Sequence, residues 1–247
     1  MTSNLQRRTP QQKFVLLFEA AKRSLLSAQM IISRLGDELS SVEPDIRAGV
    51  KIGEKITPAL LSCVSFVDFA HRYGELAAQL PMVNKSAPEM RELKAALGTV
   101  EVMRHHLQHL RGDLSSNDEI DYPILGSVSW ASGDDCFTAY LTQPTSSSVA
   151  GLGYDLQEKR WLAKYQYRVR ETHVDLDTAL AAMQSNYSWI VTVATFEKPE
   201  DSVLTWGETH CFCATINPGP GPHPNDTVEL PPSGRYLRVG ATLDSRD

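Results

Sequence analysis

The chain has 247 residues and a formal net charge of −6, with 42% apolar and 22% charged residues. This length allows one large domain or two smaller ones with a real core, and the ordinary composition argues against a disordered protein. The acidic balance argues against a surface covered in basic residues for non-specific nucleic-acid binding, although a local basic groove is compatible with it. No stretch approaches the roughly 20 apolar residues of a membrane span, and no apolar region of signal-peptide type follows the N-terminus. We therefore expect a cytoplasmic protein without membrane contact of its own.

The first half of the chain has the periodicity of helices. Residues 11–42 carry apolar side chains at steps of three and four, which predicts a long amphipathic helix. A second helix is predicted over residues 57–80, because a threonine followed by proline suits a helix start. A third begins near Ser86 and carries a sustained apolar stripe. Together these helices predict an antiparallel bundle over residues 11–115.

The pattern changes to short β-type runs after the segment SSNDEIDYP. These runs are ILGSVSW, CFTAYLT, AGLGYD, KYQYRVR, WIVTVATF and HCFCATI. At least four strands are expected within residues 122–210, with one short helix at 175–187. A segment rich in proline and glycine near residues 217–234 is predicted to be a linker or an extended arm. The expected fold class is therefore α+β, with a β-rich domain of unknown role over residues 120–247.

The four cysteines offer no recognisable metal or redox motif. Cys63, Cys136, Cys211 and Cys213 contain no C-x-x-C pair. We interpret them as small thiols in a reducing compartment, and they predict neither a cofactor nor a metal site.

The third predicted helix contains one constellation that can carry chemistry, within EVMRHHLQHLRGDL. His105 and His109 are four residues apart, so they share a face that points away from the apolar stripe, and Arg104 lies at the flank of that stripe. Histidine can take or give a proton near neutral pH, and arginine offers a permanent positive charge to phosphate oxygens. These groups suit the cleavage of RNA by its own 2′-hydroxyl without a metal ion.

Arg104, His105 and His109 together resemble the R-polar-x-x-x-H signature of the HEPN superfamily, with His105 where Asn is usual. Members of that superfamily are all-α bundles, and many are metal-independent ribonucleases of toxin–antitoxin and antiviral systems. They are usually described as dimers with a shared cleft. The resemblance covers residues 11–115 and implies an RNA-cleaving homodimer with these three catalytic residues and no cofactor. The sequence does not identify an antitoxin or sensor partner.

Three other interpretations of this helix stay open. Its histidines fit a solvated face, and a phosphorelay histidine is another option. Glu101, His105 and His109 also form a ladder at four-residue steps that has adequate metal ligands. At the level of function, the alternative is a non-enzymatic HEPN-like module whose bundle mediates dimerisation or binds a partner, while the β-rich part binds a ligand.

A second candidate surface is the predicted strand in WLAKYQYRVRETH. In strand geometry Lys164, Arg168 and Arg170 share one face, and Tyr165 and Tyr167 share the other. The cationic face could hold an RNA backbone, so we predict these three basic residues as RNA-binding. The alternative is the solvated side of an antiparallel sheet.

Overall fold

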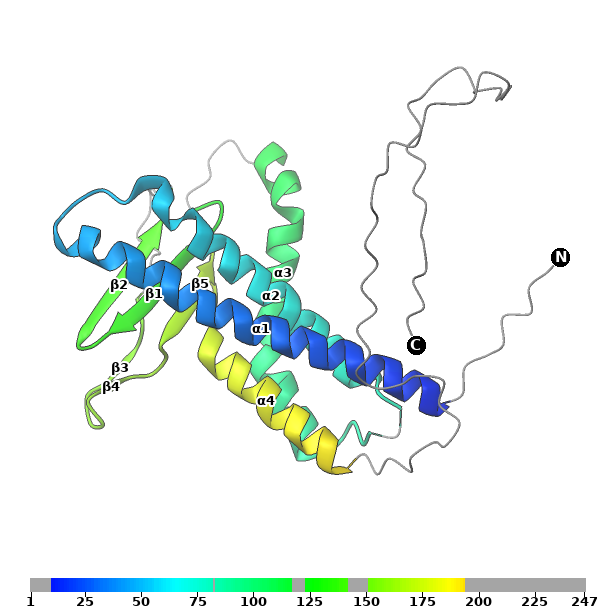
Figure 1. Ribbon diagram of the computed structural model, residues 1–247. Helices are drawn as coiled ribbons and strands as arrows, with labels where there is room; N and C mark the ends of the chain where they lie inside the picture. The colour runs from blue at the N-terminus through cyan, green and yellow to red at the C-terminus, as the bar shows by residue number, and fades with distance from the viewer. Residues whose placement is uncertain (1–9, 82, 117–122, 142–150, 194–247) are drawn as a thin grey trace, which may run out of the picture. The chain divides into compact units, whose positions relative to one another are not determined.

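The computed structural model describes residues 10–81, 83–116, 123–141 and 151–193, which belong to one compact unit. The helices in these ranges are α1 (Pro10–Arg47), the 3-10 helix η1 (Gly53–Ile56), α2 (Thr57–Gln79), α3 (Pro88–Ser116) and α4 (Leu176–Val193). α1, α2 and α4 run alongside one another, and the sheet lies against the end of α1 that leads to α2 (Figure 1). The predicted strand HCFCATI and the segment near residues 217–234 lie outside the described residues.

α1, α2 and α3 have the predicted apolar periodicity. Some of their ends differ from the predicted bounds. α1 extends beyond the predicted 11–42 at both ends, α2 begins at Thr57 as predicted, and α3 begins two residues after Ser86. The buried positions of α1 recur at steps of three, four and seven: Phe14, Phe18, Ala21, Leu25, Ala28, Leu35, Leu39 and Val42. This single buried stripe packs mainly against α2, with α4 beside it, which explains why a helix of 38 residues is stable here.

Gly36 lies in the middle of α1 and does not end it. A Cβ atom built on Gly36 would lie 2.8 Å from the hydroxyl oxygen of Tyr165 in the sheet. Glycine therefore allows the tyrosine to approach the helix backbone closely, at the modest cost in helix propensity of about 1 kcal/mol.

A buried polar group joins α2, α3 and α4. The Tyr73 hydroxyl donates to Oδ1 of Asn186 at 3.0 Å, and Nδ2 of Asn186 donates to the backbone carbonyl of Glu89 at 3.4 Å. Asn186 is only 1% exposed. Burial raises the pKa of Tyr73, so this hydroxyl stays a donor at neutral pH. The amide thus forms hydrogen bonds with groups on two other helices within the buried core.

Asn186→Ala is expected to lower the free energy of unfolding by about 1–3 kcal/mol, because it leaves the buried Tyr73 hydroxyl without an acceptor. Urea unfolding measures this change. The double variant with Tyr73→Phe, which removes both partners, should recover part of the loss. If Asn186→Ala were as stable as the parent protein, this polar group would have no structural role.

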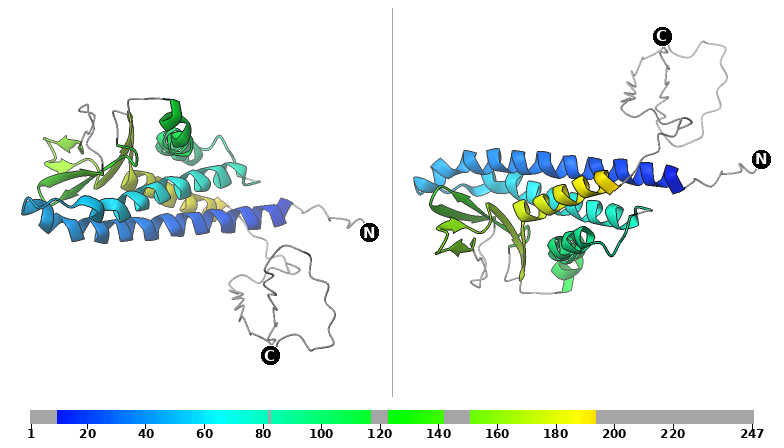
Figure 2. Two further views of the ribbon diagram at one scale, coloured as in Figure 1. Left: turned by 90° about the horizontal axis from the view of Figure 1, so that it is seen from above. Right: turned by 90° about the horizontal axis from the view of Figure 1, so that it is seen from below.

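The strands form one four-stranded antiparallel sheet in the order β2-β1-β5-β6. Their bounds are β1 (Ser127–Ser132), β2 (Asp135–Tyr140), β5 (Tyr165–Val169) and β6 (Thr172–Asp175), and a separate small hairpin pairs β3 (Tyr154–Asp155) with β4 (Arg160–Trp161). The predicted α+β class and the predicted minimum of four strands are therefore confirmed. In both views of Figure 2 the sheet and α3 lie on the same side of α1.

Side chains alternate across the sheet as strand geometry requires. The face turned to the helices is apolar and buried, and consists of Val128, Trp130, Ala139, Tyr165, Tyr167, Val169 and Val174. The opposite face is polar, and includes Ser129, Thr138, Gln166, Arg168, His173 and Asp175. Tyr165 and Tyr167 thus share one face, as the alternation predicted, and in the structure that face is buried.

The predicted strand WIVTVATF is wrong over its described part. α4 runs from Leu176 to Val193 without a break, so it also extends beyond the predicted helix at 175–187. Its buried residues are Leu176, Ala179, Met183, Asn186 and Ile190, at helical steps. A short apolar run fits a buried helix as well as a strand, and packing against the other helices decides the outcome here.

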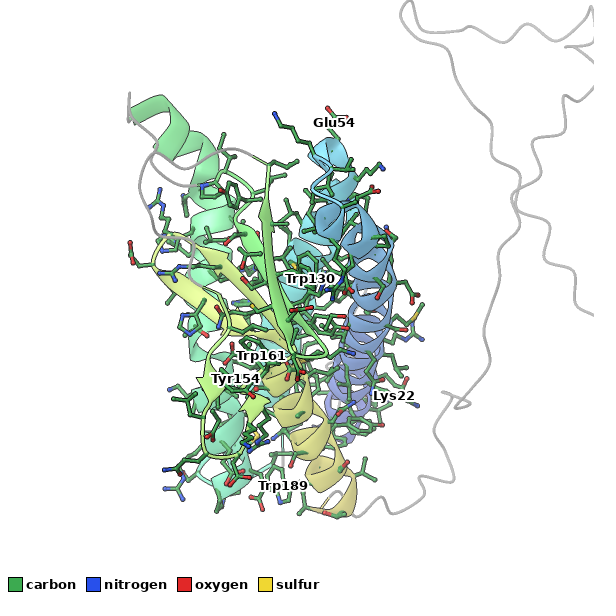
Figure 3. The ribbon with its side chains drawn as sticks, turned by 90° about the vertical axis from the view of Figure 1, so that its left-hand side faces the viewer. Lys22, Glu54, Trp130, Tyr154, Trp161 and Trp189 are labelled. Carbon is green, nitrogen blue, oxygen red and sulfur yellow. The ribbon has the colours of Figure 1, made fainter. Side chains whose placement is uncertain are left out.

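One hydrophobic core includes residues of the helices and of the sheet. Figure 3 shows Trp130 between the sheet and α1, where its Nε1 donates to Oε1 of Glu43 at 2.8 Å. α4 follows β6 directly in the chain and packs on α1, α2 and α3. In the described residues, the segments expected as separate domains at 11–115 and 120–247 therefore share one core.

Candidate functional site

α3 presents the two candidate catalytic histidines on its exposed side. Its stripe of Leu93, Leu97, Val100 and Met103 is buried against the neighbouring elements. His105 and His109 are both exposed, and their ring centroids lie 4.3 Å apart at an interplanar angle of 48°. The spacing of four residues therefore brings both imidazoles to one place on the surface.

Arg104 is held by α2. Its Nε donates to Oδ1 of Asp68 at 3.1 Å, and Nη2 of Arg72 lies 3.7 Å from the other oxygen of Asp68. The side chains of Arg104 and Asp68 are 29% and 45% exposed, so this is a surface pair that contributes about 0–1 kcal/mol. Within the described ranges, no hydrogen bond joins the guanidinium to His105 or His109.

The alternative metal ladder has no support from the geometry. No group of three or more His, Cys, Asp or Glu side chains in the described part of the chain is arranged to hold a metal ion. This finding includes Glu101, His105 and His109, which all lie in described positions of α3.

The basic residues predicted as RNA-binding do not form one open cationic face. Lys164 precedes β5 and is exposed, with its Nζ 5.0 Å from the ring centroid of Tyr165. Arg168 lies within β5 and is only 16% exposed. Arg170 lies beyond the strand, in the turn to β6, with a positive φ of 55°. The predicted contact of these residues with RNA stays a prediction.

A pocket of about 660 Å³ lies between α1 and the sheet. Its acidic lining residues are Asp37, Glu43 and Asp177. Both oxygens of Glu43 are occupied, by Nε1 of Trp130 and by Oγ of Ser132, each at 2.8 Å. These bonds attach α1 to β1.

Asp177 has a comparable structural role at the same pocket. Its Oδ1 accepts the backbone N–H groups of Lys164 and Tyr165, both at 3.1 Å. The first turn of α4 is thereby joined to the start of β5. Two of the three carboxylates of this pocket therefore hold secondary-structure elements together.

A second pocket, of about 270 Å³, lies on the polar face of the sheet. Gln166, Arg168, His173 and Asp175 line it from β5 and β6. Neither of these two pockets is lined by the candidate catalytic residues of α3.

Sequence reasoning missed Asp68, His173 and Asp175. Asp68 is a carboxylate within the largely apolar second helix, which could have indicated a polar contact. The partner of Asp68, however, depends on how α2 and α3 dock. The four-residue strand β6 was too short to be recognised beside the predicted helix at 175–187, so the pairing of His173 and Asp175 with β5 was not visible.

Comparisons with known proteins return no match to a family model, to a curated protein or to a solved structure. Among the described residues, no helix is long and apolar enough to cross a membrane. The candidate site is therefore judged on its own geometry and chemistry.

Proposed function

We propose that the protein is a metal-independent endoribonuclease-type effector of the toxin or antiviral-defence kind, acting in the cytoplasm through α3. The observation that carries this proposal is the pair of exposed imidazoles of His105 and His109, whose ring centroids lie 4.3 Å apart. Arg104 directly precedes His105 in the chain and is oriented by Asp68. Two adjacent imidazoles can supply the acid and the base that RNA cleavage by transesterification requires.

In this mechanism His109 takes the proton of the RNA 2′-hydroxyl while the 2′-oxygen attacks the phosphorus atom. The bond from phosphorus to the 5′-oxygen breaks, and His105 assists by giving a proton to that leaving oxygen. The products are a 2′,3′-cyclic phosphate and a 5′-hydroxyl, and the roles of the two histidines can be exchanged. No metal ion is needed, because the charge that develops on the phosphate is met by arginine.

Arg104 is the phosphate-binding group in this proposal. Its contact with Asp68 uses Nε, so the two NH₂ groups of the guanidinium are available for a bidentate contact with phosphate oxygens. Asp68 would hold the side chain in one orientation, which reduces the entropy lost when RNA binds.

The proposed assembly is a homodimer through the helical part. His105 and His109 lie on an exposed helix face, and a C₂ pairing of two α3 helices would enclose two copies of the motif in a shared cleft. The same pairing would exclude water around the reacting groups. Light scattering at micromolar concentration tests this assembly, and a monomer throughout the range would contradict it.

The activity is tested with the purified full chain on a mixed RNA substrate, with and without EDTA. We expect cleavage products that end in cyclic phosphate, at a rate that EDTA does not change. Activity abolished by EDTA would contradict the metal-independent mechanism. Absence of cleavage would favour the second candidate, a non-enzymatic dimerisation and ligand-binding module, which the pocket on the polar face of the sheet supports.

A further inference from the structure

The pocket of about 270 Å³ on the polar face of the sheet has an unusual combination of charges. β5 and β6 are paired so that Arg168 lies opposite His173, and Gln166 lies opposite Asp175. Because these four residues share one face, Arg168 and Asp175 are diagonal neighbours, typically about 7–8 Å apart. A cation and an anion therefore line the same small cavity. Within the described residues they form no ion pair with each other.

Neither charge is well compensated by the protein. The Arg168 side chain is 16% exposed, whereas Glu171, its ion-pair partner at 3.5 Å, is 88% exposed. An ion pair of that kind is screened by solvent and weak. Nε of Arg168 donates to the backbone carbonyl of Arg170 at 3.0 Å, which is a neutral acceptor. The largely buried guanidinium thus retains capacity for an anionic group.

Asp175 has the complementary capacity. Its Oδ1 accepts a hydrogen bond from Nε2 of Gln166 at 2.8 Å, and Gln166 itself is 8% exposed. An amide donor orients a carboxylate but does not neutralise it. A ligand with a positive charge next to a negative one would satisfy Asp175 and Arg168 at once.

The rest of the pocket lining limits the remainder of the ligand. It is formed by Gly151, Gly153, Leu162 and Ala163, which carry no polar side chain. A Cβ atom on Gly153 would lie 2.8 Å from Cδ1 of Leu162, so glycine keeps this part of the lining close to the leucine. A volume of about 270 Å³ is far larger than the space that one water molecule needs. This room suits a small molecule with a short apolar part.

We propose that this pocket binds a small zwitterion of the α-amino acid class, with its carboxylate on Arg168 and its ammonium group on Asp175. The ligand's side chain lies against Leu162 and Ala163. The two charged groups of an α-amino acid are close together, so both reach their partners from one position between the strands. This site uses none of the proposed catalytic residues of α3, although Arg168 is also one of the three residues predicted to bind RNA.

The test uses the full chain and the standard amino acids, one at a time, in thermal-shift and calorimetric titrations. Acetate, methylamine and inorganic phosphate are the single-charge controls. We expect at least one small apolar amino acid to bind, and acetate and methylamine to bind at least about tenfold more weakly, since each satisfies only one charge. This comparison needs only the unmodified protein.

Two variants locate the site. Arg168→Gln and Asp175→Asn should each raise the Kd of that amino acid by about tenfold or more, because each removes one charged partner. Arg91→Gln and Asp134→Asn make the same charge changes at exposed positions outside the pocket and should leave the Kd unchanged. The proposal is overturned if no amino acid binds, if acetate or phosphate binds as tightly as the amino acid, or if binding survives both pocket variants.

Discussion

His109→Ala is expected to reduce RNA cleavage by roughly 10²-fold or more, the range typical of removing a general acid or base. Alanine cannot transfer a proton, and the neighbouring imidazole of His105 cannot serve as acid and base in the same turnover. Because His109 is exposed, its loss should leave the free energy of unfolding within about 0.5 kcal/mol of the parent value. Cleavage of a labelled RNA and urea unfolding of the same preparations provide both measurements.

Gln108→Ala is the matched control for this variant. Gln108 is the exposed neighbour of His109 on α3, and it has no role in the proposed proton transfer. Equal cleavage by the parent protein, the control and His109→Ala would refute the catalytic role. Expression of the parent and His109→Ala in a bacterial host, scored by growth and RNA integrity, extends the test to the effector role.

Arg104→Ala should reduce cleavage by a similar factor of roughly 10², because it removes the positive charge that stabilises the phosphate in the transition state. This variant also removes the ion pair with Asp68, so Asp68→Asn is needed beside it. Asp68→Asn keeps the guanidinium while removing its charged partner, and we expect a much smaller loss of activity. If both variants lost activity equally, Arg104 would act by joining α2 to α3 and not by binding phosphate.

Gly126→Ala is expected to lower the free energy of unfolding by about 2–5 kcal/mol. Gly126 precedes β1 and has a φ of 73°, in the left-handed region that costs a residue with a side chain about 1–2 kcal/mol. A Cβ atom there would overlap the backbone carbonyl oxygen of Arg168 and lie 2.9 Å from Cε2 of Tyr167. Backbone must therefore move between β1 and β5, which adds about 1–3 kcal/mol.

Gly133→Ala separates these two contributions. Gly133 has a φ of 62°, but a Cβ atom there has no other atom within 4 Å. Gly133→Ala should therefore lower the free energy of unfolding only by the cost of the left-handed backbone conformation, about 1–2 kcal/mol. Urea unfolding of both variants gives the difference. Equal losses would mean that the close approach at Gly126 relaxes without strain.

The sequence by itself determined those features that depend on near neighbours in the chain. The apolar steps of three and four specified α1, α2 and α3, and the Thr57–Pro58 pair specified where α2 begins. Alternation placed Tyr165 and Tyr167 together on one face of β5. The spacing of His105 and His109 also predicted that the two rings share an exposed face. In each case the side chains concerned lie within a few residues of one another, so helix or strand geometry alone sets their relation.

Only the tertiary structure decided which distant segments meet. WIVTV continues α4 because Ile190 is buried, and Trp189 partly buried, against helices that end many residues earlier, whereas Val191 and Val193 are exposed. Arg104 meets Asp68 because α2 and α3 dock, and Arg168 shares a pocket with Asp175 because β5 and β6 pair in one particular register. A shift of that register by one residue would place one of the two charges on the buried face. Such contacts depend on the packing of complete elements, and no local pattern of residues encodes them.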